Sequence, residues 1–479
     1  MLIQILRGVI KMTNKELLEE ISLKDKNAFL TMSEAELKDM NILCDGYREY
    51  LDNGKTEREC VDISIKMAEE NGFVNIENKK DLKAGDKVYI INRGKGIMLA
   101  IMGSEPMTSG ANIVGAHVDS PRLDLKQNPL YEADDMALLK THYYGGIKKY
   151  QWTAIPLAMH GVVYKKNGER VDIKIGEAEN DPVFCITDLL PHLAMKQVTK
   201  KMNEAIEGEQ LNILIGGYPV NDDDINEKVK FTILKYLYDK YGMCEADFQT
   251  AELEVVPAFK ARNVGLDESF IGAYGQDDRV CAYTTLKSIF DIEAPKRTAI
   301  ALLVDKEEIG SEGNTGMQSE FFRMTIAQMI EMEKGSCLVT DLNRAISNSA
   351  CLSSDVNAAV DPNYEYVSEK RNASYCNHGV TFTKFTGVRG KSSSSDANAE
   401  FVSEIARMMD DDGVIWQTGE LGKVDEGGGG TIAMYVANMN MDVIDAGVPV
   451  LSMHAPFEVV GKADIYMAYR AYKTFYTKR

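Results

Sequence analysis

Five side chains of the types that bind divalent cations stand where apolar runs end or a helix begins. Two imidazoles with three carboxylates suit a pair of borderline-hard dications, in which each ion takes one imidazole and one terminal carboxylate while the third carboxylate bridges both. Such ions, about 3.5–4 Å apart, lower the pKa of a shared water and stabilise an oxyanion. The pattern therefore predicts metal-assisted hydrolysis. The five residues are His117, Asp277, Glu308, Asp355 and His454.

Glu307 stands beside Glu308 and is not needed as a ligand. Both glutamates follow the apolar run 299–305, an unusual place for two ionised carboxylates unless they are paired or metal-bound. We therefore predict Glu307 as the general base, which takes the proton of water and returns it to a leaving amine. Asp119 comes two residues after His117 and is predicted to hold its second ring nitrogen.

Each of these residues also has a simpler interpretation. Taken singly, the candidates have these simpler roles: a loop cap for His117, a solvated charge pair for Glu307 and Glu308, a helix N-cap for Asp277, a turn residue for Asp355 and a core histidine for His454. All of these simpler interpretations would have to hold at once for the site to be absent. The occurrence of all these residues in one chain therefore favours the metal site.

Strands and helices must bring these distant residues together. The runs 87–93, 96–103 and 111–119 are typical of strands, and the S/T-x-x-E spacing at Ser33 and at Thr56 predicts two capped helices before them, the second ending near Gly72. Further strands, each followed by polar residues, are predicted within 270–280, 297–310, 335–343 and 447–456. Because ligands bind at the carboxyl ends of strands in open α/β sheets, the side chains that follow these runs are expected to meet there.

The region 125–250 has a different sequence pattern, which is typical of β-structure. It contains a strong hairpin signal, Asn167-Gly168, between two runs of alternating apolar and polar residues. After it, residues 279–292 are predicted to form a helix with an apolar face. We therefore predict an α/β fold in which one discontinuous domain, residues 1–124 and 251–479, is interrupted by a β-rich domain, residues 125–250.

Length and composition support this organisation. A chain of 479 residues with 44% hydrophobic residues is longer than a single hydrophobic core usually accommodates, which favours two domains. Its net charge of −19 argues against nucleic-acid or anionic-membrane partners. The eight cysteines form no CxxC pair, which predicts a reducing, cytoplasmic compartment. Residues 1–11 lack a signal-peptide cleavage pattern and are interpreted as an extension before Met12.

Six segments resemble the aspartyl aminopeptidase and aminopeptidase I family of zinc metallopeptidases across nearly the whole chain. The resemblance implies a phosphorylase/hydrolase-like α/β/α catalytic domain with an inserted dimerisation domain. It also implies two zinc ions per subunit, one held by His117 and Asp355 and the other by Glu308 and His454, with Asp277 bridging them; cobalt or manganese would suit the same ligands. The segments are GAHVDSPRLDLK, LLPHLA, GQDDRV, DKEEIGSEG, SSDVNAAVDPNY and SMHAPFEV.

The resemblance nominates three further residues. His192 matches a histidine that reaches the active site of a neighbouring subunit, which implies a dimer-based homo-oligomer, typically a dodecamer; it could equally pack within the insert. Lys391 is the nearest counterpart of a lysine that recognises acidic N-terminal residues, or a solvated loop residue. Gly428, within the run 426–431, is expected to let the backbone approach a peptide substrate.

The implied activity is thus a two-zinc aminopeptidase, with acidic or with broad and neutral N-terminal preference. Two alternatives are a hydrolase of N-acyl amino acids and a non-catalytic, zinc-stabilised oligomeric scaffold.

Overall fold

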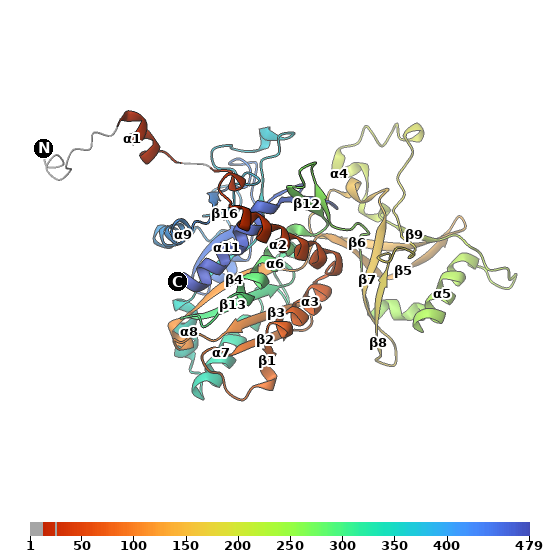
Figure 1. Ribbon diagram of the computed structural model, residues 1–479. Coiled ribbons are helices and arrows are strands. Elements are labelled where there is room, and N and C mark those ends of the chain that lie inside the picture. The colour runs from red at the N-terminus through yellow and green to blue at the C-terminus, as the bar shows by residue number, and fades with distance from the viewer. Residues whose placement is uncertain (1–12, 24–25) are drawn as a thin grey trace, which may run out of the picture.

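The computed structural model describes residues 13–23 and 26–479 (Figure 1). The interpretation of residues 1–11 as an extension lies outside this range. The first helix, α1 (Asn14–Ile21), begins with a capping box at Thr13 and buries none of its residues. In Figure 1 it lies apart from the rest of the chain.

A nine-stranded sheet forms the centre of the larger part of the molecule, and its inner strands β13, β4, β14 and β18 run parallel. These strands are mostly apolar and, apart from Asp442, wholly buried, because both faces of the sheet are covered. In spatial order, the strands are β1 (Val74–Asn75), β2 (Lys87–Asn92), β3 (Gly96–Ile101), β13 (Thr298–Val304), β4 (Ala111–His117), β14 (Ala350–Ser353), β18 (Asp442–Gly447), β16 (Val380–Thr383) and β17 (Trp416–Thr418).

Helices pack on both faces of this sheet, each over its own apolar core. The first face is covered by α2 (Glu34–Asn53), α3 (Glu57–Glu70), α6 (Gln276–Phe290), α9 (Ala399–Asp411) and α11 (Lys462–Lys478). The second is covered by α7 (Phe321–Lys334), α8 (Val339–Asn348) and α10 (Ala433–Ala437). The predicted α/β/α arrangement is therefore confirmed.

The structure contains the two capped helices and the hairpin that local sequence patterns predict. Ser33 and Thr56 cap α2 and α3, and each accepts the backbone N–H of the glutamate three residues later. The hairpin at Asn167-Gly168 joins β7 to β8. The strand predicted within 335–343 is wrong, because α8 begins there at Val339: the Asp341 carboxylate caps the helix by accepting the N–H of Leu338.

A six-stranded sheet forms the second part, to the right in Figure 1. Its strands, in spatial order, are β8 (Arg170–Ile175), β7 (Leu157–Tyr164), β10 (Ala251–Pro257), β5 (Arg122–Ala133), β6 (Met136–Tyr144) and β9 (Ile213–Gly216), accompanied by α4 (Met202–Ala205) and α5 (Lys228–Tyr241). It has its own apolar core around Trp152. The exact domain limits stay a prediction.

A five-stranded sheet contacts α6 and α11. Its strands are β11 (Arg262–Val264), β12 (Phe270–Ala273), β20 (Glu458–Gly461), β19 (Pro449–Leu451) and β15 (Asn357–Ala358). Strands β12 and β19 lie in predicted strand segments, but their grouping in a separate sheet was not predicted. Short 3₁₀ turns complete the chain: η1 (Ala28–Leu30), η2 (Ile76–Asn78), η3 (Met107–Ser109), η4 (Lys149–Trp152), η5 (Pro191–Leu193), η6 (Gly208–Gln210), η7 (Glu245–Thr250), η8 (Glu307–Ile309) and η9 (Glu365–Val367). Within the described ranges, no helix is both long and apolar enough to cross a membrane.

Candidate metal centre

Two sheets deliver the five predicted ligands. His117 ends β4, Glu308 lies in η8 just after β13, and Asp355 follows β14; these three strands are neighbours in the nine-stranded sheet. Asp277 and His454 instead follow β12 and β19 of the five-stranded sheet. The expectation that one sheet edge gathers every ligand is therefore corrected, because the site lies where two sheets meet.

Asp277 lies between the two imidazoles. Its Oδ1 is 3.2 Å from His117 Nε2, and its Oδ2 is 3.1 Å from His454 Nε2. Each imidazole has a second carboxylate nearby: Asp355 Oδ1 lies 3.8 Å from His117 Nε2, and Glu308 Oε2 lies 3.6 Å from His454 Nε2. The structure thus brings these five residues together, with Asp355 near His117 and Glu308 near His454.

The donor set fits divalent cations of the zinc type. His117 Nε2 and Glu308 Oε1 are buried, and neither has a hydrogen-bond partner among residues 13–23 and 26–479. Burial raises the pKa of Glu308 and of Asp355 well above the ordinary range. Among the described residues, no lysine or arginine forms an ion pair with either carboxylate. Imidazole nitrogens and carboxylate oxygens that converge without a cationic side chain are the ligands of zinc sites.

Asp119 contacts His117, and it also contacts Tyr144 and the backbone of Glu307 and Glu308. The nearest partner of His117 Nδ1 is the backbone carbonyl of Asp119, at 3.0 Å, while the carboxylate lies at 3.3 Å. That buried carboxylate also accepts the backbone N–H groups of Glu307 and Glu308, at 3.1 and 3.2 Å. The Tyr144 hydroxyl donates to it at 2.8 Å. Asp119 therefore connects the His117 strand end to the turn that carries both glutamates.

Glu307 points towards the same centre without joining a hydrogen-bonded pair there. Its Oε2 lies 4.0 Å from His117 Nε2. Burial raises its pKa to about 7. A carboxyl group with a pKa near neutrality can accept a proton and release it again, as a general base and acid requires.

His454 is held by two partners that the sequence analysis did not single out. Its Nδ1 donates to the carbonyl of Gly146 at 2.8 Å, and its backbone N–H donates to Glu458 Oε1 at 2.7 Å. Glu458 Oε2 also accepts the backbone N–H of Asp277 at 3.1 Å. An acid at the start of the buried run 458–461 was a sequence signal for Glu458, whereas nothing local points to Gly146 or Tyr144.

The three remaining predicted residues do not join the cluster. His192 lies exposed in η5 and, within the described chain, makes no hydrogen bond or ion pair with the ligands. The Lys391 ammonium pairs with Asp396 at 3.1 Å and lies over the Phe385 ring. Gly428 has φ +135°, and a Cβ there would lie 2.3 Å from the carbonyl oxygen of Gly387. This glycine is thus required by the chain's own packing; the substrate roles of all three stay predictions.

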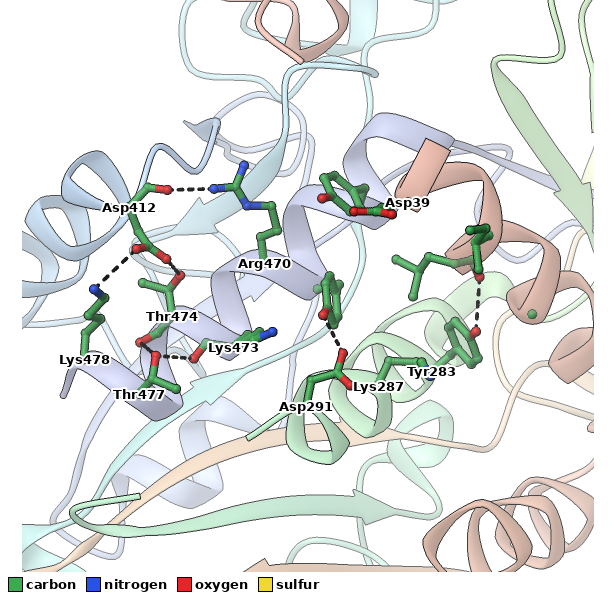
Figure 2. A pocket seen from close by; sticks show the side chains of 15 residues that line it. Asp39, Tyr283, Lys287, Asp291, Asp412, Arg470, Lys473, Thr474, Thr477 and Lys478 are labelled. Carbon is green, nitrogen blue, oxygen red and sulfur yellow. Dashed lines mark hydrogen bonds and ion pairs between the residues drawn. The ribbon is translucent and has the colours of Figure 1, made fainter. Parts of the chain in front are cut away.

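Two cavities bear on where a substrate binds. A groove of about 720 Å³ between α2, α6 and α11, shown in Figure 2, contains none of the predicted residues, and its Arg470 donates to the backbone carbonyl of Asp412. A cavity of about 300 Å³ lies beside His454, lined also by Met453 and residues 146–148 and 151. The His454 side chain is 33% exposed, so the metal centre is reachable from this second cavity.

Comparisons with known proteins show similarity over most of the chain. A family model described as aminopeptidase I zinc metalloprotease (M18) matches residues 50–476. A probable M18 family aminopeptidase 1 of Clostridium acetobutylicum is 52% identical over 454 residues, which are 94% of this chain and 97% of the relative. The crystal structure of an M18 family aminopeptidase from Thermotoga maritima is 43% identical, with TM-score 0.93, covering 96% of this chain and 100% of that one. The mApe1 dodecamer of S. cerevisiae, 20% identical with TM-score 0.74 over 91% of this chain and 97% of that one, shares the fold.

Proposed function

Because the chain belongs to the M18 family of zinc aminopeptidases, which are hydrolases, we propose that it removes single N-terminal residues from peptides with two zinc ions and Glu307 as general base. The observation that carries this proposal is the position of Asp277, whose two oxygens face His117 and His454 at 3.2 and 3.1 Å. A carboxylate placed in this way between two imidazoles is suited to bridging two cations.

The residues have distinct roles in binding. His117 and Asp355 would hold one zinc, Glu308 and His454 the other, and Asp277 both. When bound, the zinc ions supply positive charge that acidifies water and stabilises negative charge on the carbonyl oxygen of the scissile bond.

Glu307 moves the proton. Its carboxylate accepts a proton from the water that attacks the scissile carbonyl, and the resulting carboxylic acid donates it to the leaving amino group. Burial supports both halves of this cycle because it raises the pKa of Glu307 to about 7. The hydrogen bond from its backbone N–H to Asp119 fixes the turn that presents the carboxylate.

The test is Glu307→Gln, with the exposed neighbour variant Glu312→Gln as control. Glu307→Gln is expected to keep its zinc by elemental analysis and to lose about 10²–10⁴-fold in kcat on aminoacyl anilides. Near-normal turnover would refute the general-base role, and loss of zinc would show that Glu307 is a ligand instead. Zinc without turnover on any substrate in the wild type would favour the scaffold.

Specificity for acidic N-terminal residues would rest on Lys391, which must leave Asp396 to pair with a substrate carboxylate. A panel of Asp, Glu, Leu and Ala anilides with wild type and Lys391→Ala separates the alternatives. Selective loss of Asp and Glu turnover supports acidic preference, while an unchanged profile supports a broad or neutral aminopeptidase. Cleavage of N-acetylated peptides as fast as free ones would indicate an N-acyl hydrolase.

We also propose a dimer-based homo-oligomer, a dodecamer as in the S. cerevisiae structure, in which His192 acts in a neighbouring subunit. The segment around His192 exposes large apolar side chains, among them Leu193, Met195 and Val198 at 67%, 80% and 75%. Burying such side chains favours association. Mixing inactive His192→Ala with inactive Glu307→Gln should restore activity, since a mixed pair contains one site with both residues. No recovery in verified mixed oligomers would refute action across subunits.

The eight cysteines are all free thiols, which supports the proposed cytoplasmic location.

A further inference from the structure

The segment 144–146, which begins at the last residue of β6, contacts both sides of the proposed metal centre through Tyr144 and Gly146. The Tyr144 hydroxyl donates to Asp119 Oδ2 at 2.8 Å, and Asp119 lies against Nδ1 of His117. The carbonyl of Gly146 accepts Nδ1–H of His454 at 2.8 Å. One short segment of the six-stranded sheet therefore contacts the outer environment of both imidazoles, although the imidazoles come from two other sheets.

The sheet holds Tyr144 rigidly. Tyr144 is the cross-strand partner of Arg122 on β5, and the Arg122 guanidinium lies 3.8 Å from the centre of the Tyr144 ring. Arg122 is itself fixed by ion pairs from its Nε to Asp124 at 2.8 Å and to Glu254 at 3.2 Å. A buried ring under a guanidinium that is held in this way has little freedom to turn, so the hydroxyl stays directed at Asp119.

Gly145 allows the backbone to pass between the two contacts. Its φ is +72°, in the left-handed region that favours glycine. A Cβ at this position would lie 3.3 Å from Glu308 Oε2 and 3.4 Å from the Cα of Pro121. A side chain at position 145 would therefore crowd the proposed ligand Glu308.

We propose that residues 144–146 are a positioning element for both histidine ligands, Tyr144 acting through Asp119 and Gly146 acting directly on His454. An acceptor at each Nδ1 keeps the proton on that nitrogen and leaves Nε2 free to face a cation. The inserted sheet of a chain thereby helps to build the metal site of that same chain. This inference rests on the proposed function, because it assumes that the five ligands bind zinc.

The test compares Tyr144→Phe with Tyr143→Phe, which removes a hydroxyl from the adjacent, 43% exposed tyrosine. Zinc affinity is measured by chelator competition without substrate, and the melting temperature of the zinc-free protein is measured beside it. Loss of such a partner of a metal ligand typically weakens binding by about 10–100-fold. Tyr144→Phe should show this loss with a nearly unchanged zinc-free melting temperature, and Tyr143→Phe should match wild type in both.

A second variant, Gly145→Ala, tests the backbone part, and the visible spectrum of the cobalt-loaded protein reports on ligand geometry in both variants. Altered cobalt spectra relative to wild type and Tyr143→Phe would support the inference. Wild-type zinc affinity in Tyr144→Phe, or a fall in zinc-free stability alone, would overturn it. Failure of the wild type to bind zinc would instead overturn the proposed function.

Discussion

The carboxylate of Asp119 accepts the backbone N–H of Glu307 at 3.1 Å. A residue that sequence spacing connects only to His117 therefore also fixes the turn η8, 188 positions further along the chain. Disturbing Asp119 should affect metal binding and proton transfer together, because the same two oxygens serve both.

Asp119→Asn is expected to weaken zinc binding by about 10–100-fold and to lower kcat as well. An asparagine has one acceptor oxygen, so its NH₂ group would face a backbone N–H or the Tyr144 hydroxyl. Chelator competition and steady-state kinetics measure the two effects, with the exposed Asp45→Asn as control. Unchanged zinc affinity would show that the backbone carbonyl of residue 119 alone orients His117.

Glu458→Gln should destabilise the zinc-loaded protein by about 1–3 kcal/mol, since one buried N–H, of His454 or of Asp277, loses its acceptor. Denaturant unfolding measures this loss. The exposed variant Glu49→Gln should unfold like wild type. If Glu458→Gln unfolds like wild type too, these two hydrogen bonds do not hold the centre together.

Removal of zinc should make stability strongly dependent on pH. In the chain without cations, burial raises the pKa of Glu307 to about 7 and that of Glu458 to about 8. A carboxyl with a raised pKa favours the folded state while protonated, and this stabilisation is lost as the pH rises through the folded pKa. The melting temperature of chelated protein should therefore fall by several degrees between pH 6 and 9, whereas zinc-loaded protein should change less. Parallel curves would argue that these carboxyls do not meet the zinc ions.

His160 should contribute a second, independent pH dependence. It lies buried, with Nδ1 2.9 Å from Glu59 and Nε2 3.0 Å from Glu177. Burial opposes its charge, but hydrogen bonds to Glu177 and Glu59 outweigh burial and raise the pKa. The stabilisation is complete below the ordinary pKa of 6.5 and is lost as the pH rises through the raised value.

His160→Gln should therefore lower the free energy of unfolding by roughly 2 kcal/mol at pH 6 and by less at pH 9. Denaturant unfolding at both pH values, with the exposed His142→Gln as control, measures the difference. A deficit that is equal at both pH values would mean that His160 is neutral in the folded protein.

Two of the candidate ligands could be located from the sequence because each comes at or just after the end of a largely apolar run. His117 ends the mostly apolar strand β4, and Glu308 comes four residues after the mostly apolar strand β13. The apolar residues of 335–343 are compatible with a strand, but the helical spacing of Leu342, Ala345 and Ile346 becomes visible only beyond that segment.

The contacts of Tyr144 and Gly146 could not be predicted. They depend on how a third sheet meets the other two, and no local pattern encodes the packing of distant sheets. The same holds for the assignment of Asp277 and His454 to the five-stranded sheet.

The ligands are spread from residue 117 to residue 454. During synthesis, a growing polypeptide that has reached residue 300 contains only two of the five proposed ligands, His117 and Asp277. Two ligands are too few to bind two metal ions. Binding of both proposed ions would therefore wait until His454 has been synthesised and the sheets have come together. On the proposed ligand assignment, the order of residues along the chain would set when each zinc ion can be bound.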